Sequence, residues 1–156
     1  MKELSERIEQ RGAIYLWKYK TDGWIGSEWH FSVDETGKIF FLSLLDEFEK
    51  CDTESRYTIQ LTEVTQEVLE IPDFNSPFEN RRELKLTFTP FDSHFNEWVV
   101  GDNENVIDIA FGRRILNDWR RLVLIEQEVI EDNGIGLNED DTLFIWPKLT
   151  ETPTDS

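Results

Sequence analysis

The chain has 156 residues, 38% of them hydrophobic and 13% aromatic, which suits one domain with a buried core. It carries 16 basic and 33 acidic residues, and the formal net charge of −17 argues against direct binding to nucleic-acid phosphates or to an anionic membrane. Both halves of the chain are about equally acidic, so we expect a negative surface throughout. That surface permits a basic protein partner or serves solubility alone.

Single residue types narrow the class of protein further. Cys51 is the only cysteine, which excludes an internal disulfide and a zinc cluster of cysteines. Its acidic neighbours in EKCDTE also disfavour a reactive thiolate. The charged start MKELSERIEQ lacks the apolar stretch of a signal peptide, and no run of about 18 apolar residues occurs. We therefore expect a cytoplasmic protein, and no motif indicates a metal or a cofactor.

After a short helix expected within residues 2–11, two alternating segments predict a β-hairpin. The segments GAIYLWKYK, residues 12–20, and SEWHFSVD, residues 27–34, alternate in a way that is typical of strands. The turn signal KTDGW lies between them. The two strands are therefore expected to be antiparallel neighbours.

The second of these strands has one polar face. Its apolar face carries Trp29, Phe31 and Val33, and its polar face carries Glu28, His30, Ser32 and Asp34. Such an alternation predicts one buried and one solvent-exposed face. A histidine among carboxylates and a hydroxyl could also act in acid–base catalysis, so the polar face is either an ordinary exposed surface or a candidate site.

The next part of the chain predicts one helix and several strands. After the turn DETGK, apolar residues recur at i, i+3, i+4 and i+7, which predicts a helix at about residues 39–50 that buries Phe41, Leu44, Leu45 and Phe48. Alternating segments predict strands within residues 56–62, 83–90, 95–102 and 105–112. Residues 75–82 read as a loop, and LFIWP at 143–147 predicts a last strand.

Together these elements predict an α+β fold. We expect a single domain over residues 1–147, with a mainly antiparallel sheet of about six to seven strands and two main helices on one face. Residues 148–156 are polar and are expected to form a flexible tail.

The second main helix is predicted over residues 113–131 by an apolar stripe about 140° wide. The stripe comprises Ile115, Leu116, Trp119, Leu122, Val123, Val129 and Ile130. The opposite side is basic and predicts a solvated face of Arg113, Arg114, Arg120 and Arg121. Asp118 is spaced to pair with two of these arginines, Arg114 and Arg121.

Two features do not suit an ordinary amphipathic helix. The basic residues lie near its N-terminus and the acidic residues near its C-terminus, which opposes the helix dipole. Glu126 also falls within the apolar stripe. Either the helix ends or bends before Glu126, or this carboxylate is buried with a partner, or it is a catalytic group.

The strongest local concentration of negative charge follows this helix. No basic residue occurs between Leu122 and Pro147, and Gly134 is expected to cap the helix before an open loop. The acidic residues do not match the ligand spacing of an EF-hand. We predict that a partner-binding surface is formed by Glu128, Glu131, Asp132, Glu139, Asp140 and Asp141. The alternative is an ordinary solvated loop.

Two further groups give weaker signals. Asp92, Ser93 and His94 are adjacent in FDSH, but catalytic triads are assembled from residues that are distant in sequence. Trp24 and Trp146 lie beside turns and are candidates for exposed anchors that contact a partner.

The sequence leads to three hypotheses about function. The first is a non-enzymatic acidic interaction domain that binds a basic protein. In size, charge and architecture, although in no motif, this chain is similar to bacterial toxin-neutralising immunity proteins. The second is a nucleic-acid mimic, which requires an unbroken acidic stripe. The third is a small enzyme or ligand-binding domain whose pocket gathers His30, His94 or Glu126.

Overall fold

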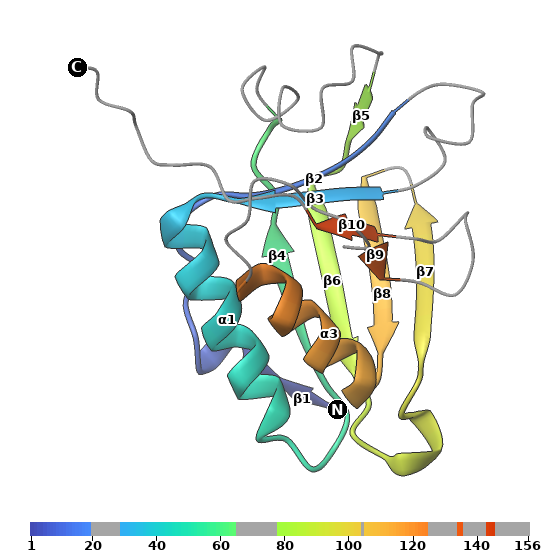
Figure 1. Ribbon diagram of the computed structural model, residues 1–156. Helices are drawn as coiled ribbons and strands as arrows, with labels where there is room; N and C mark the ends of the chain where they lie inside the picture. The colour runs from blue at the N-terminus through green and yellow to red at the C-terminus, as the bar shows by residue number, and fades with distance from the viewer. Residues whose placement is uncertain (20–28, 65–77, 104, 125–133, 136–142, 146–156) are drawn as a thin grey trace.

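The computed structural model describes residues 1–19, 29–64, 78–103, 105–124, 134–135 and 143–145 (Figure 1). Over these ranges the fold is α+β, with helices α1 (Glu35–Glu49) and α3 (Arg113–Leu124). The first sheet has the order β1 (Lys2–Glu3), β4 (Ser55–Gln60), β6 (Glu83–Phe88), β8 (Val106–Phe111), β7 (Trp98–Asn103). The second has the order β5 (Phe78–Asn80), β2 (Ile14–Tyr19), β3 (Trp29–Val33), β10 (Leu143–Ile145), β9 (Gly134–Ile135).

The division into two sheets corrects the expectation of one sheet with six to seven strands. Five of the eight strand pairs are antiparallel, while β1–β4, β6–β8 and β3–β10 are parallel. β8 returns to lie between β6 and β7, and β10 adds to the far side of β3. Period-two alternation identifies a strand but carries no information about its partner, so the sequence did not reveal this pairing.

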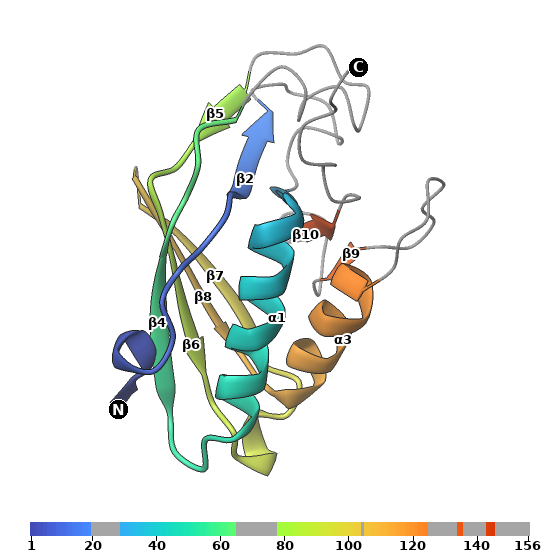
Figure 2. The same ribbon diagram turned by 90° about the vertical axis from the view of Figure 1, so that its left-hand side faces the viewer.

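Both helices cover the same face of the first sheet, as predicted (Figure 2). From α1, Phe48 contacts the rings of Phe88 and Phe111, at centroid distances of 5.9 and 5.4 Å. From α3, Trp119 contacts the rings of Phe111 and Trp98, each at 6.1 Å. The alternating inward side chains of β4, β6 and β8 are buried beneath the helices, while the opposite face of this sheet remains open to solvent.

The second sheet shares this core. Phe31 of β3 packs against Phe41 of α1 and Trp119 of α3, at 5.0 and 5.5 Å between ring centroids. The expected wet face of β3 is wrong, because His30 and Ser32 are each only 1% exposed. β3 lies in the interior of its sheet between β2 and β10, and the ring of Trp17 stacks on His30 at 5.6 Å.

Helix α1 begins at Glu35, four residues before the predicted start, because Asp34 is its N-cap. The Asp34 carboxylate accepts hydrogen bonds from the backbone N–H groups of Gly37, at 2.7 Å, and Ala13, at 2.9 Å. A Cβ atom at Gly37 would lie 2.2 Å from the Ala13 carbonyl oxygen, so the helix start fits closely against the residue before β2. The segment DETGK is therefore a helix start and not a turn.

Other local predictions are also corrected. The N-terminal segment forms the short strand β1 and the 3-10 turn η1 (Leu4–Glu6), because Lys2 and Glu3 pair with β4. The loop predicted at 75–82 contains β5, which pairs with β2. Gly134 lies in β9, paired with Phe144, and so does not begin an open loop. The segment FDSH forms a turn, as its sequence predicts, with the 3-10 turn η3 at Asp92–His94.

The amphipathic prediction for the second helix holds over the part of it that is described. Five residues of its apolar stripe are buried in α3, namely Ile115, Leu116, Trp119, Leu122 and Val123. Val129 and Ile130 lie outside the described residues. Of the helices in the described ranges, none is long and apolar enough to cross a bilayer.

Candidate interaction surfaces

The predicted partner-binding residues, Glu128, Glu131, Asp132, Glu139, Asp140 and Asp141, lie outside the residues that the structure describes. The same holds for Glu126, for the two candidate anchors Trp24 and Trp146, and for the expected tail at 148–156. Their roles therefore stay predictions. The described part of the chain can be examined for what it adds to this surface.

The described residues have nearly balanced charges, with 14 basic and 18 acidic side chains and a net charge of −4. On the described helices and strands, acidic side chains are therefore interspersed with Lys and Arg.

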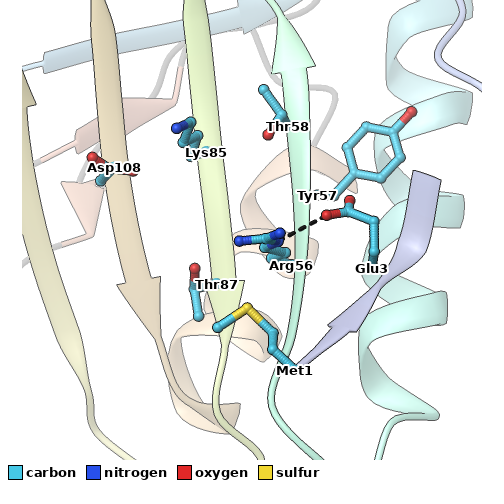
Figure 3. Close-up of a pocket in the computed structure, with 8 residues that line it drawn as sticks. All are labelled: Met1, Glu3, Arg56, Tyr57, Thr58, Lys85, Thr87 and Asp108. Atoms are coloured by element: carbon cyan, nitrogen blue, oxygen red, sulfur yellow. Dashed lines mark hydrogen bonds and ion pairs between the residues drawn. The ribbon is translucent and has the colours of Figure 1, made fainter.

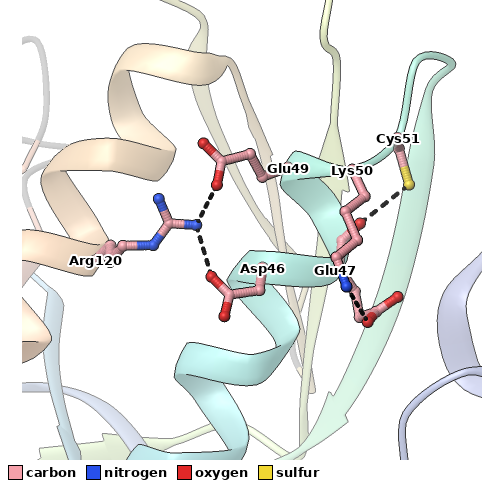
Figure 4. A network of polar contacts seen from close by, with 6 residues as sticks. All are labelled: Asp46, Glu47, Glu49, Lys50, Cys51 and Arg120. Carbon is pink, nitrogen blue, oxygen red and sulfur yellow. Dashed lines mark hydrogen bonds and ion pairs between the residues drawn. The ribbon is translucent and has the colours of Figure 1, made fainter.

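Many acids of the described surface are neutralised by arginine. Figure 4 shows Arg120 of α3 reaching between two carboxylates of α1: its Nη2 atom lies 3.0 Å from Asp46 Oδ1 and 2.9 Å from Glu49 Oε1. The predicted pairs of Asp118 are also present, at 3.8 Å to Arg114 and 3.9 Å to Arg121. The predicted pairing with Asp118 is confirmed, and Arg114 and Arg121 are exposed as expected. The prediction of a fully solvated face is wrong for Arg120, which is 23% exposed and links α3 to α1.

The start of α3 explains why arginines are tolerated against the helix dipole. The backbone N–H of Arg114 donates to the Phe95 carbonyl at 3.0 Å, so a neighbouring loop satisfies part of the helix N-terminus. The guanidinium of Arg113 lies 5.5 Å from the centre of the Phe88 ring, in a cation–π contact. The Nη1 group of Arg114 donates to Asn96 Oδ1 at 3.1 Å. Local contacts thus offset the unfavourable placement of the charges.

A second arginine network joins the two sheets. Arg81, in the connection between β5 and β6, donates through Nε and Nη2 to both oxygens of Asp102 on β7, at 2.8 and 2.9 Å. Its Nη1 donates to Glu79 of β5 at 3.3 Å. The Arg81 guanidinium and the Lys18 ammonium each lie 5.3 Å from the ring centre of Trp29. Arg81 thus links strands of the second sheet to β7 of the first. Its charge is largely neutralised by these contacts, so we assign it a structural role and not a ligand-binding one.

The solvent-exposed face of the first sheet carries a shallow polar pocket (Figure 3). Its floor is set by the strand register, which places Thr58, Lys85 and Asp108 in one row across β4, β6 and β8. At its margin, Arg56 Nε donates to Glu3 Oε2 at 2.8 Å. Two cations and two carboxylates balance each other here, so this pocket has no charge preference that would select a ligand.

A second hollow, of about 370 Å³, lies at the connection between β6 and β7. It is lined by Asp92, Ser93, His94, Phe95, Asn96, Glu97, Trp98 and Val99. The sequence signal that could have indicated it is the segment FDSHFNEW, where two phenylalanines stand among polar residues. Two phenylalanines of this connection are substantially exposed, Phe91 at 49% and Phe95 at 44%.

Within this hollow, His94 contacts both Ser93 and Glu97, as the histidine of a hydrolase triad contacts its serine and its acid. Ser93 Oγ lies 3.0 Å from His94 Nδ1, and Glu97 Oε1 lies 3.8 Å from His94 Nε2. The backbone N–H groups of His94 and Phe95, however, donate to carbonyls within the same turn, so they are not free to stabilise an oxyanion. The imidazole side chain is also 44% exposed, which leaves it in contact with solvent. The arrangement is therefore poor evidence for a serine hydrolase site.

The remaining candidate groups do not converge. His30 is buried in β3 of the second sheet, whereas His94 is exposed in η3, which connects two strands of the first sheet. Cys51 is buried, and its thiol lies 3.3 Å from the carbonyl oxygen of Glu47 in the last turn of α1. The described residues include no group of three or more His, Cys, Asp or Glu side chains placed to hold a metal ion.

Comparison of the chain with protein-family models, with curated proteins and with solved structures finds no match.

Proposed function

We propose that the protein is a non-enzymatic interaction domain whose acidic residues bind a basic protein partner. The observation that carries this proposal is in the sequence: residues 122–147 contain seven acidic and no basic residues. A concentrated negative field accelerates and orients the approach of a basic partner.

The nucleic-acid mimic is less well supported. Such a mimic requires carboxylates in an unbroken row, as phosphates are along a duplex. On the described surface, Arg120 lies between Asp46 and Glu49, and Arg81 lies between Glu79 and Asp102. The acids of this part are therefore interrupted by guanidinium groups, which favours recognition of a folded basic protein over imitation of a nucleic acid.

The proposal is tested by affinity capture of proteins from the source cell at about 0.1 M and about 1 M salt, where the Debye lengths are roughly 10 and 3 Å. We expect a basic protein to be retained at the lower salt concentration and lost at the higher one. Replacing six carboxylates by amides should weaken its retention about tenfold or more, which corresponds to about 1.4 kcal/mol. That variant combines Glu128→Gln, Glu131→Gln, Asp132→Asn, Glu139→Gln, Asp140→Asn and Asp141→Asn.

A matched variant controls for total charge. It removes six exposed carboxylates of the described fold through Glu6→Gln, Glu9→Gln, Glu35→Gln, Asp52→Asn, Glu63→Gln and Asp108→Asn. Both variants carry a net charge of −11. Equal retention of the partner by the two variants would show that only net charge matters. Capture that does not depend on salt, or no captured basic protein, would overturn the proposal.

A further inference from the structure

Three of the six large apolar side chains that are exposed among the described residues lie in or beside the connection from β6 into β7. Phe91, Phe95 and Val99 are 49%, 44% and 59% exposed, although each belongs to a residue type that is usually buried. Phe95 and Val99 also line the hollow at this connection. Exposed aromatic residues in such a cluster are typical of protein-binding surfaces.

The backbone beneath these side chains is held firmly. The N–H groups of His94, Phe95 and Glu97 donate to carbonyls within the turn, at 2.9 to 3.2 Å. The N–H of Gly112 donates to the Glu97 carbonyl at 3.0 Å. A Cβ atom at Gly112 would lie 1.9 Å from the His94 carbonyl oxygen, so the turn packs directly on the start of α3. The phenylalanines are thus presented in a fixed arrangement, which lowers the entropy cost of binding.

Two carboxylates meet beside this apolar surface. Glu54 Oε2 lies 3.5 Å and Glu97 Oε2 lies 3.4 Å from the same hydroxyl oxygen, Thr89 Oγ1. A hydroxyl has one proton and can donate to only one carboxylate at a time. Among the described residues, no Lys or Arg lies within ion-pair distance of either carboxylate. The one basic side chain near Glu97 in this part of the chain is His94, whose Nε2 lies 3.8 Å from Glu97 Oε1. The pair therefore lacks a cation.

The two nearby arginines are engaged elsewhere. Arg114 donates to Asn96 and lies 3.8 Å from Asp118, and Arg113 lies over the Phe88 ring. Neither of these arginines neutralises Glu54 or Glu97, so the two carboxylates are open to a cation from a partner.

We propose that this surface docks an arginine flanked by apolar residues on a partner protein, with the guanidinium at Glu54 and Glu97 and the apolar flanks on Phe91 and Phe95. Arginine fits better than lysine, because its planar fork donates to two carboxylates at once and stacks on aromatic rings. The inference rests on the proposed function, since it specifies how a basic partner is recognised on the described fold.

The test uses the full-length ¹⁵N-labelled protein and two blocked tripeptides, acetyl-Leu-Arg-Leu-amide and its citrulline counterpart. Citrulline keeps the shape of arginine but has no charge. We expect the arginine peptide to shift the backbone amide signals of Thr89 and of residues 91–99, and the citrulline peptide to bind at least about tenfold more weakly. Equal shifts with both peptides, or shifts confined to other residues, would overturn the inference.

Variants locate the binding. The double variant E54Q/E97Q should weaken binding of the arginine peptide about tenfold, whereas the matched variant E6Q/E63Q, which also removes two charges, should bind as the wild type does. The variant Phe95→Ala should weaken both peptides several-fold, because the apolar contact is shared. If E54Q/E97Q does not fold, Phe95→Ala decides the question, since its exposed side chain is not required for folding. Peptide affinity unchanged in Phe95→Ala counts against the inference.

The outcomes also separate this inference from the proposed function. If a salt-sensitive basic partner is captured but the arginine peptide does not bind near Thr89, the docking surface is wrong and the proposed function stands. If the peptide binds there but no basic protein is captured, the proposed function fails while the surface remains a cation-recognising one.

Discussion

At the scale of single residues, Asp102 is the side chain with the clearest electrostatic role. The hydrogen bonds that Arg81 donates lower the pKa of the Asp102 carboxyl; burial opposes this shift, and the charges of Arg81 and Lys18 add to it. A carboxyl whose pKa is lower in the folded than in the unfolded state stabilises the fold above the unfolded pKa, near 4. That stabilisation is lost as the pH falls through the folded pKa.

We therefore expect Asp102→Asn to lower the free energy of unfolding at pH 7 by about 1 kcal/mol, a modest value because the side chain is 37% exposed and screened by solvent. The difference from wild type should shrink as the pH falls below about 4 and through the lower folded pKa. Urea unfolding across this range measures it. Asp108→Asn is the control, because Asp108 is exposed on the neighbouring strand β8 and forms no ion pair with another described residue. A constant difference at every pH would contradict the assignment.

At the scale of elements, Asp34 fixes where α1 begins and how it meets β2. Its carboxylate accepts one hydrogen bond from the helix and one from the Ala13 backbone. We expect Asp34→Ala to lower the free energy of unfolding by about 1–2 kcal/mol, since it removes the cap and leaves a partly buried N–H unpaired. Asp34→Asn should retain most of the stability.

The measurement for Asp34 is the urea midpoint followed by tryptophan fluorescence, with an unchanged slope as evidence that two-state unfolding is retained. Asp52→Ala serves as the control, because Asp52 is exposed beyond the other end of α1. Equal midpoints for Asp34→Ala and Asp52→Ala would show that the cap does not contribute to stability.

The elements also show what sequence reasoning can and cannot reach. The sequence predicts strands at 14–19, 55–60, 83–88 and 106–111. A strand with one buried face alternates apolar and polar residues, and this alternation is visible in the sequence. The burial of His30 was not predictable, because alternation within one strand does not show whether packing covers its second face. Local pattern identifies an element, whereas neighbours and sheets are set by packing among distant segments.

The same distinction applies to the candidate surfaces. Charge counting pointed to the acids that follow α3, and those residues remain a prediction. Sequence reasoning missed the pair Glu54 and Glu97, because 43 positions separate them. They meet at one hydroxyl only because β4 pairs with β6 and the connection into β7 folds back beside Thr89. The exposed phenylalanines were equally hidden, because a phenylalanine in sequence suggests a core residue unless its burial is known.

At the scale of the whole molecule, the two sheets and both helices share one core, and the C-terminal strand β10 is part of it. Leu143 is 1% exposed and belongs to the same hydrophobic cluster as Phe31 and Trp119. We expect Leu143→Ala to lower the free energy of unfolding by about 2–4 kcal/mol, through lost burial and a residual cavity. Chemical denaturation measures this loss.

Leu124→Ala is the matched control, since Leu124 is 51% exposed at the end of α3. Its effect should stay within about 0.5 kcal/mol. If the two leucine variants are equally stable, β10 does not belong to the cooperative unit, and the second sheet would unfold separately from the first.

The parallel pairing of β3 with β10 also has a consequence for synthesis of the chain. Phe31 of β3 pairs with Ile145 of β10, so β3 leaves the ribosome long before β10 has been translated. At about 5–20 residues per second, the delay is roughly 6–23 s. During that interval one edge of a strongly hydrophobic strand has no β10 to pair with. The second sheet can be completed only late in translation, so chaperones that bind nascent apolar strands should recognise the segment around Trp29–Val33 first.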